Sequence, residues 1–144
     1  MTEHTPDRSH FLKTLRSPFP RLLGMEVVEV ELGRAVVHLP SSAQLLDDGG
    51  QWHSSAVFAL ADTASGRAAN SALDGVRRSV TLEMQINFIS LASGAECVAE
   101  ARVIHQGRSS LIVECEVRTA GGEAMARTLA TFIVLNPRPD RVVH

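Results

Sequence analysis

The sequence shows no excess of either charge that would suggest a nucleic-acid partner. Its 144 residues include 14 basic and 16 acidic side chains, which give a formal net charge of −2 and are spread along the chain. The longest basic cluster is the pair Arg77-Arg78. Proteins that bind nucleic-acid backbones usually gather Lys and Arg on one surface. We therefore expect no nucleic-acid partner.

Long apolar runs are also missing. The longest unbroken one in the central segment extends from Ala56 to Ala61, whereas a membrane-spanning helix needs roughly 20 apolar residues. The first ten residues, MTEHTPDRSH, are polar and have neither the basic start nor the apolar stretch of a secretory signal. We therefore expect no membrane partner and a cytoplasmic location.

Cysteine is scarce, and histidine is not clustered. Cys97 and Cys115 lie in alternating apolar patterns without a CxxC or Cys/His spacing, so we expect buried free thiols rather than a disulfide, redox or zinc role. No HxxxH pair occurs among the six histidines, at positions 4, 10, 38, 53, 105 and 144. These patterns argue against metal catalysis, and no cofactor is indicated.

The composition is that of a globular protein, with 44% hydrophobic and 21% charged residues. The length suits a single domain over residues 1–144. Residues 1–19 are expected to form a helical lead-in, with a helix over 6–15 that the sequence SPFP ends, because proline lacks the N–H donor. Residues 137–144 form a polar tail.

The residue pattern of segment 24–71 predicts a hairpin, a loop and a helix. The segment GMEVVEVELGRAVVHLP, residues 24–40, contains two β-rich runs around Gly33-Arg34 and ends at Pro40. A polar loop covers 41–52. The next segment repeats apolar residues with helical spacing, at Val57, Ala61, Ala64 and Ala68. Its other side is hardly more polar, which predicts a central helix surrounded by protein.

Four strands are predicted after this helix. Residues 80–88 alternate, with apolar residues at even positions and Thr81, Glu83, Gln85 and Asn87 at odd ones, as in a half-buried strand. The other strands cover 97–105, about 111–117 and 124–135, and Gly-containing turns separate them. Tight turns imply antiparallel neighbours. The class is therefore α+β, with a curved sheet packed on one helix.

Asp62 is a carboxylate in the middle of this apolar helix. Arg67 points about 140° away from it, so no cation lies on its side of the helix. If that side is covered, loss of water disfavours the ionised form and leaves a basic carboxylate suited to proton transfer or attack. The alternative is a structural aspartate that binds a backbone donor or caps a loop. The residues that share its side are Ser55, Phe58, Ala59, Gly66 and Ala69.

The start of this helix, His53-Ser54-Ser55, is a second candidate element. Helix N-termini carry unpaired N–H groups and a partial positive charge, which can hold an oxyanion or a phosphate. Ser54 and Asp62 lie about 12 Å apart in rise. One helix can hardly direct both groups at a single atom, but two copies meeting at a dimer interface could. Alternatively, one serine simply caps the helix and His53 is a loop residue.

The segment HSSAVFALADTASGRAAN resembles the PaaI-like branch of hotdog-fold acyl-CoA thioesterases, whose pattern is His-Gly-Gly followed by Leu-Ala-Asp-Thr-Ala. The strands SVTLEMQINFIS, ARVIHQGRSSLIVECEV and ARTLATFIVL support the resemblance, which covers about residues 20–136. It implies a hotdog fold, in which a curved antiparallel sheet wraps around one central helix. It also implies hydrolysis of an acyl-CoA to the free acid and CoA.

The resemblance assigns roles to four residues. Asp62 matches the catalytic carboxylate, acting as general base or nucleophile, and Thr81 matches a hydroxyl that helps to hold the attacking water. His53 matches the entry histidine. Ser54 matches the glycine whose backbone N–H polarises the thioester oxygen. In the family the site lies across a subunit interface, which implies a homo-oligomer: a dimer at least, and a dimer of dimers, or homotetramer, as the expected assembly.

The substrate-binding residues that we expect are Asp47, Ser55 and Arg108. Ser54 and Ser55 stand where the family has glycines, and Asp47 stands where it has an asparagine. A serine in place of a glycine that needs positive φ would be strained. Arg108, in the turn HQGRS, is expected to contact CoA phosphates, or else to be a solvated surface arginine. The alternative function is an acyl-CoA-binding hotdog protein with little or no activity.

Overall fold

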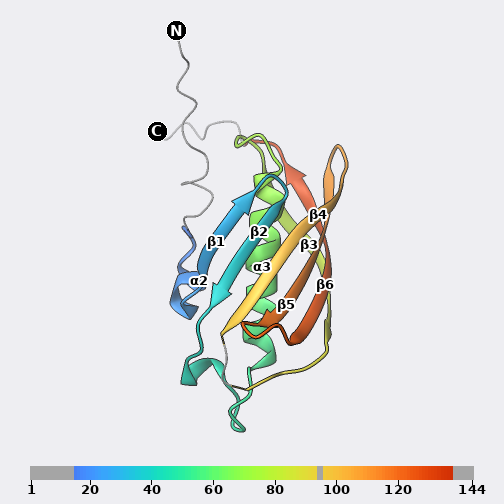
Figure 1. The fold of residues 1–144 in the computed structure, drawn as a ribbon. Helices are drawn as coiled ribbons and strands as arrows, with labels where there is room; N and C mark the ends of the chain where they lie inside the picture. Colours follow the sequence, from blue (N-terminus) through green and yellow to red (C-terminus); the bar gives the residue numbers. More distant parts are fainter. Residues whose placement is uncertain (1–14, 94–95, 138–144) are drawn as a thin grey trace.

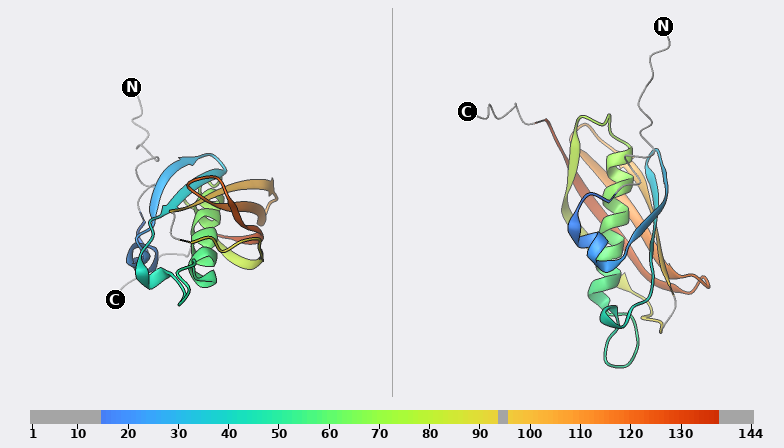
Figure 2. Two further views of the ribbon diagram at one scale, coloured as in Figure 1. Left: turned by 60° about the horizontal axis from the view of Figure 1, so that its bottom comes forward. Right: turned by 90° about the vertical axis from the view of Figure 1, so that its left-hand side faces the viewer.

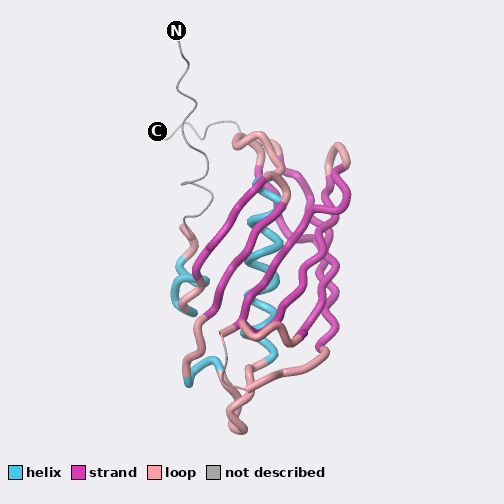
Figure 3. The backbone as a smooth tube through the Cα atoms, in the orientation of Figure 1, coloured by secondary structure: helices cyan, strands magenta, loops and turns pink. Residues whose placement is uncertain are grey.

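The computed structural model describes residues 15–93 and 96–137, which form one sheet wrapped around a long helix (Figures 1 and 3). The predicted helix over 6–15, apart from Leu15, and the tail beyond residue 137 lie outside the described residues. In chain order the elements are α2 (Pro18–Leu23), β1 (Glu26–Glu31), β2 (Arg34–Leu39), η1 (Ala43–Leu45), α3 (Ser54–Ser71), β3 (Arg78–Phe88), β4 (Cys97–Gln106), β5 (Ser110–Thr119) and β6 (Ala124–Leu135).

The six strands are antiparallel and curl around α3, as the left panel of Figure 2 shows. This confirms the predicted α+β hotdog architecture. The expectation that β3 and β4 are neighbours was wrong, because the strand order is β1-β2-β4-β5-β6-β3. After β3 the chain crosses beneath the start of α3, where Trp52 N–H donates to Ala92 O at 3.2 Å. This long connection leaves β3 at one edge of the sheet.

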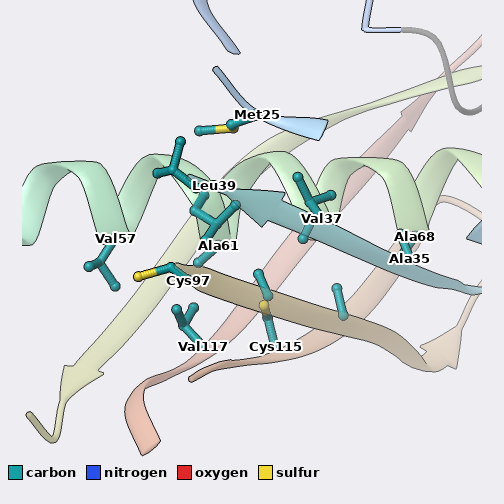
Figure 4. Packing of buried hydrophobic residues seen from close by; sticks show 14 of the residues in the cluster. Met25, Ala35, Val37, Leu39, Val57, Ala61, Ala68, Cys97, Cys115 and Val117 are labelled. Atoms are coloured by element: carbon teal, nitrogen blue, oxygen red, sulfur yellow. The ribbon is translucent and has the colours of Figure 1, made fainter. Parts of the chain in front are cut away.

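The sheet approaches α3 closely because the facing helix residues are small. Ala61, Ala64 and Ala68 are fully buried and pack against β2, β4 and β5 (Figure 4). Cys97 and Cys115 are buried free thiols in this core, as predicted. The helix is not covered all round, since Phe58 is 37% exposed and Asp62 is half-buried. Among the described helices, none has the length and apolar character needed to cross a bilayer.

A bulge in β3 changes the predicted alternation of that strand. Thr81 pairs with Phe132 and Glu83 with Thr131, so Leu82 is one extra residue opposite β6. Thr81 therefore turns to the helix side of the sheet, the side on which the half-buried Met84 lies. The prediction that Thr81 and Met84 occupy opposite faces was wrong, because one inserted residue reverses the alternation.

The short helix α2 begins where the sequence predicted a helix end. Pro18 occupies its first turn, where a missing N–H costs nothing because the first N–H groups of a helix lack intrahelical acceptors. Gly24 ends the helix with φ of 87°, a left-handed conformation that suits glycine. The SPFP segment is thus the start of α2. Ser17 and Pro20 bring this segment alongside α3 next to Asp62.

Candidate active site

Asp62 and Thr81 meet between α3 and β3. Thr81 Oγ1 donates a hydrogen bond of 3.0 Å to Asp62 Oδ1. The contact depends on the β3 bulge, which turns Thr81 towards the helix. The two side chains line a hollow of about 420 Å³ between α2, α3 and β3. Within the described part of the chain Asp62 forms no ion pair, so Thr81 holds one carboxylate oxygen and the other is left for a ligand.

In the first turn of α3, one backbone N–H group has no acceptor within the described residues. His53 caps the helix, because its Nδ1 accepts from Ser55 N–H at 3.1 Å. His53 O accepts from Ala56 N–H at 3.0 Å and from Val57 N–H at 3.3 Å. Ser54 N–H has no acceptor among residues 15–93 and 96–137. The alternative that a serine caps the helix was wrong, because the imidazole already fills that place.

The two serines at the helix start are not strained. No non-glycine residue in the described ranges has a positive φ. Ser54 and Ser55 are the first residues of a regular helix, so serine in place of glycine at these positions does not distort the backbone.

The cap also fixes the orientation of the His53 ring, because its Nδ1 accepts from Ser55 N–H. A neutral imidazole that accepts at Nδ1 carries its proton at Nε2.

Asp47 orders the loop that precedes α3. Its Oδ1 accepts from Gly49 N–H at 2.8 Å and from Gln51 N–H at 3.0 Å. Its backbone N–H donates to Gln51 O at 2.7 Å. These bonds close the loop directly before His53, so the carboxylate is a structural group of the helix entry.

Arg108 lies at the other end of α3. The turn that contains it joins β4 to β5, and the neighbouring Gln106 Nε2 donates to Ala72 O, just beyond the end of the helix, at 3.4 Å. In Figure 1 this turn is at the top, whereas the start of α3 is at the bottom. Within one chain, therefore, Asp62 and Thr81 are together, His53, Ser54 and Ser55 are together, and Arg108 is remote from both groups.

Sequence reasoning missed several residues that line the hollow. Asn70 Oδ1 accepts from Ser79 N–H at 2.9 Å and from Ser79 Oγ at 3.1 Å. Arg67 lines the wall, and burial, assisted by the charge of Arg16, lowers the pKa of its guanidinium. Gly66 lines it too. The spacing of residues 62, 66 and 70 places them along one side of a helix, a signal that could have been found in the sequence.

No group of three or more His, Cys, Asp or Glu side chains in the described ranges is arranged to hold a metal ion. The hollow offers the Asp62 carboxylate and the Thr81 hydroxyl, with Arg67 and Asn70 in its wall, and the separate start of α3 offers the Ser54 N–H donor. This set is suited to acid–base or nucleophilic attack on a carbonyl group.

Comparison with known proteins identifies the family. Residues 49–126 match the model of the Thioesterase superfamily. The acyl-coenzyme A thioesterase PaaI of Escherichia coli is 31% identical, with 67% of this chain and 68% of that protein aligned. A putative esterase of Saccharolobus solfataricus is 28% identical, over 82% of this chain and 84% of its own length.

Solved structures agree with this match. A conserved protein of Pseudomonas aeruginosa superimposes with a TM-score of 0.81 and 39% identity, covering 90% of this chain and 100% of its own. The E. coli PaaI structure superimposes with a TM-score of 0.79 and 25% identity, covering 85% of this chain and 87% of its own. The chain belongs to the thioesterase superfamily and is a PaaI-like hotdog protein.

Proposed function

We propose that this protein hydrolyses an acyl-CoA thioester to the free acid and CoA, with Asp62 as the catalytic carboxylate. The observation that carries the proposal is the hydrogen bond from Thr81 Oγ1 to Asp62 Oδ1 at the edge of an open hollow. The family match supports thioester hydrolysis as the reaction class. The name of the PaaI relative supports acyl-CoA as the substrate class.

In the proposed reaction Asp62 acts on water or on the thioester itself. As a base, the carboxylate takes a proton from water while the water oxygen forms a bond to the carbonyl carbon. The tetrahedral intermediate then breaks its C–S bond, and the CoA thiolate takes up the proton. Thr81 fixes the carboxylate rotamer through the bond to Oδ1, and its hydroxyl oxygen can accept a hydrogen bond from the water. As a nucleophile, Asp62 would attack the carbonyl carbon and expel the CoA thiolate as the C–S bond breaks. Water would then cleave the resulting anhydride, which releases the free acid and restores the carboxylate.

The oxyanion donor in the proposal comes from a second copy of the chain. Ser54 and Asp62 are eight residues apart, or about 12 Å in helical rise, too far for both to contact one carbonyl group. The N–H of Ser54 has no acceptor in the described ranges, and the helix N-terminus adds a partial positive charge. A dimer that brings Ser54 of one copy to Asp62 of the other would complete the site.

The edge strand β3 supports such a dimer. It is the last strand of the sheet, and it exposes apolar side chains, with Val80 39%, Leu82 62% and Phe88 43% exposed. An exposed apolar edge strand is a surface for pairing with another chain. Pairing of β3 edges about a two-fold axis would run the two copies of α3 antiparallel. It would also bring Arg108 of one copy towards the helix start of the other.

In that arrangement Arg108 would contact the CoA phosphates. Ser55 and the Asp47 loop would border the thioester beside His53. The assembly that we propose is a homodimer, with a dimer of dimers as the larger form.

An acyl-CoA-binding protein without turnover is the second candidate. It is favoured by the serines that replace the family's glycines, although their regular backbone keeps the Ser54 donor in place.

Release of free thiol from a panel of acyl-CoA substrates distinguishes the two functions. We expect wild type to hydrolyse at least one substrate, and Asp62→Asn to lower kcat by about 10²–10⁴-fold, since positioned acid–base groups contribute that much. The matched control is Glu114→Gln, which neutralises an exposed carboxylate on β5 and should leave the rate unchanged. Equal background rates in wild type and Asp62→Asn would leave only the binding function.

A further inference from the structure

Gly66 is a glycine that the structure of the chain does not require. It lies within the 18-residue helix α3 and has no positive φ, so its backbone conformation is open to any residue. A Cβ added at this position would lie 3.9 Å from Phe132 Cε1, an ordinary van der Waals distance. A glycine inside a helix is less stable than alanine. Neither conformation nor packing within the described residues explains why alanine is absent.

The missing side chain leaves open space beside the proposed catalytic carboxylate. Gly66 lines the same hollow as Asp62, one helical turn further along α3, and Asn70 follows one more turn along. The three positions form a row with steps of about 6 Å. The rest of the lining is mixed. Its apolar members come from the segment before α2, from α2 and from the sheet: Leu15, Pro20, Val80 and Phe132. Its polar members are Ser17, Thr63, Arg67, Ser79 and Thr81.

Asn70 provides polar donors at the far end of the row. Its Oδ1 is fixed by two hydrogen bonds from Ser79. This identifies the other terminal atom as the amide nitrogen, whose two N–H groups have no acceptor in the ranges 15–93 and 96–137. An unpaired amide on the wall of a partly apolar hollow is a ready donor for an oxygen atom of a ligand.

We propose that the acyl group lies along α3 from Asp62, across Gly66, to Asn70. Gly66 provides the space for the acyl group, and Asn70 Nδ2 donates to an oxygen at its far end. The substrate class is therefore an acyl-CoA whose acyl group carries an oxygen substituent remote from the thioester. The inference rests on the proposed function, because it uses Asp62 as the position of the thioester carbonyl.

Gly66→Ala tests the position of the acyl group through S-alkyl CoA thioethers, which cannot be hydrolysed. We expect this variant to bind S-hexyl-CoA about tenfold more weakly than wild type, since one methyl group in a filled pocket has effects of this order. Binding of S-methyl-CoA should stay within about twofold, because the shared CoA portion lies elsewhere. Equal losses for both ligands would place pantetheine over Gly66, and no loss for either, or no binding by wild type, would also overturn the proposal.

The melting temperature of the same variant provides an independent check. Alanine should raise Tm by about 3 °C, since it favours the helix and meets no close neighbour. A lower Tm would mean that glycine is required for packing, and the argument for a ligand over Gly66 would fail.

Asn70→Asp tests the polar end of the proposed acyl site, where Asn70 Nδ2 would donate to the ligand. Aspartate keeps an oxygen to accept from Ser79 but removes both N–H donors. Wild type should prefer S-(5-oxohexyl)-CoA, whose terminal ketone only accepts hydrogen bonds, over S-hexyl-CoA by about tenfold. We expect Asn70→Asp to lose this preference and Asn136→Asp, an exposed control just after β6, to keep it. No preference in wild type, or a preference that persists in Asn70→Asp, would overturn the role of Asn70.

These binding measurements test the proposed acyl site separately from the reaction. If Gly66→Ala and Asn70→Asp change thioether binding as expected but wild type releases no thiol from any acyl-CoA, the proposed hydrolysis fails and the acyl site stands. If Asp62-dependent hydrolysis is found but Gly66→Ala weakens binding of both thioethers equally, the reaction stands and the acyl site is overturned.

Discussion

The two thiols of the core are protected by burial. Burial raises the pKa of Cys97 and of Cys115 from 9.0 to about 12, and the nearby charge of Glu96 adds to the shift at Cys97. The thiolate is the reactive form of cysteine. Because the folded pKa exceeds the unfolded value, the folded state keeps protons that the unfolded state loses above pH 9.0. Stability from these groups is therefore complete below pH 9.0 and declines as the pH rises above it.

We expect a disulfide reagent such as DTNB to leave both thiols of the native protein unmodified at mildly alkaline pH, and to modify both in guanidinium. The measurement is the absorbance of the released thiol over time, with and without denaturant. Rapid modification of native protein would show that the α3–sheet core opens readily. A melting temperature that does not fall between pH 9.0 and the raised pKa of about 12 would contradict the assigned shifts.

Individual residues differed in how far the sequence could identify them. Asp62 stood out because a lone carboxylate on an apolar helix is a chemical anomaly that the pattern itself reveals. Thr81 was named only through the resemblance, since strict alternation placed it on the wrong face. The bulge at Leu82 has no signature in a pattern of period two, because it arises from pairing with β6. The N-cap role of His53 was missed for a different reason, because serine is the commoner N-cap residue and two serines follow His53.

At the level of elements, one hydroxyl joins the β1–β2 hairpin to the end of α3. Ser71 Oγ accepts from Gly33 N–H at 2.9 Å and lies 2.8 Å from Glu31 O and 2.7 Å from Ala68 O. Gly33 has φ of 77°, the left-handed conformation that this turn requires. Ser71 is 3% exposed, so water cannot readily replace it.

Ser71→Ala is expected to lower the free energy of unfolding by about 1–3 kcal/mol, because it leaves the Gly33 N–H without its acceptor. The measurement is denaturant unfolding followed by circular dichroism. Ser41→Ala, in an exposed loop, removes the same hydroxyl and should have almost no effect. A loss for Ser71→Ala no larger than that for Ser41→Ala would mean that the hairpin is held by packing alone.

The elements themselves were predictable where local patterns determine them. The sequence placed the last strand at about 124–135, the bounds that the structure gives, because Gly121-Gly122 mark its start and the proline-containing tail marks its end. The order of strands was not predictable in the same way. The connection from β3 to β4 contains turn-forming residues, yet it crosses the base of α3 through bonds such as Trp52 N–H to Ala92 O. Those contacts are long-range, and local sequence does not encode them.

At the scale of the whole molecule, the proposed site requires two chains. Ser54 is the first residue of α3, where proline is tolerated because its missing N–H has no intrahelical acceptor. The preceding residue, His53, has φ of −67° and ψ of 132°, the extended conformation that a following proline favours. Ser54→Pro therefore removes the proposed oxyanion donor with little disturbance of the helix.

Ser54→Pro alone should lower kcat by about 10²–10³-fold, the typical effect of losing one oxyanion donor. Refolding Ser54→Pro together with Asp62→Asn should then recover activity. In a mixed dimer, the intact Asp62 of one copy meets the intact Ser54 of the other, which rebuilds one complete site. A site contained within one chain would give no recovery, since each copy lacks one of the two groups. Thiol release from the refolded mixture, compared with each variant refolded alone, therefore decides whether catalysis is shared between subunits.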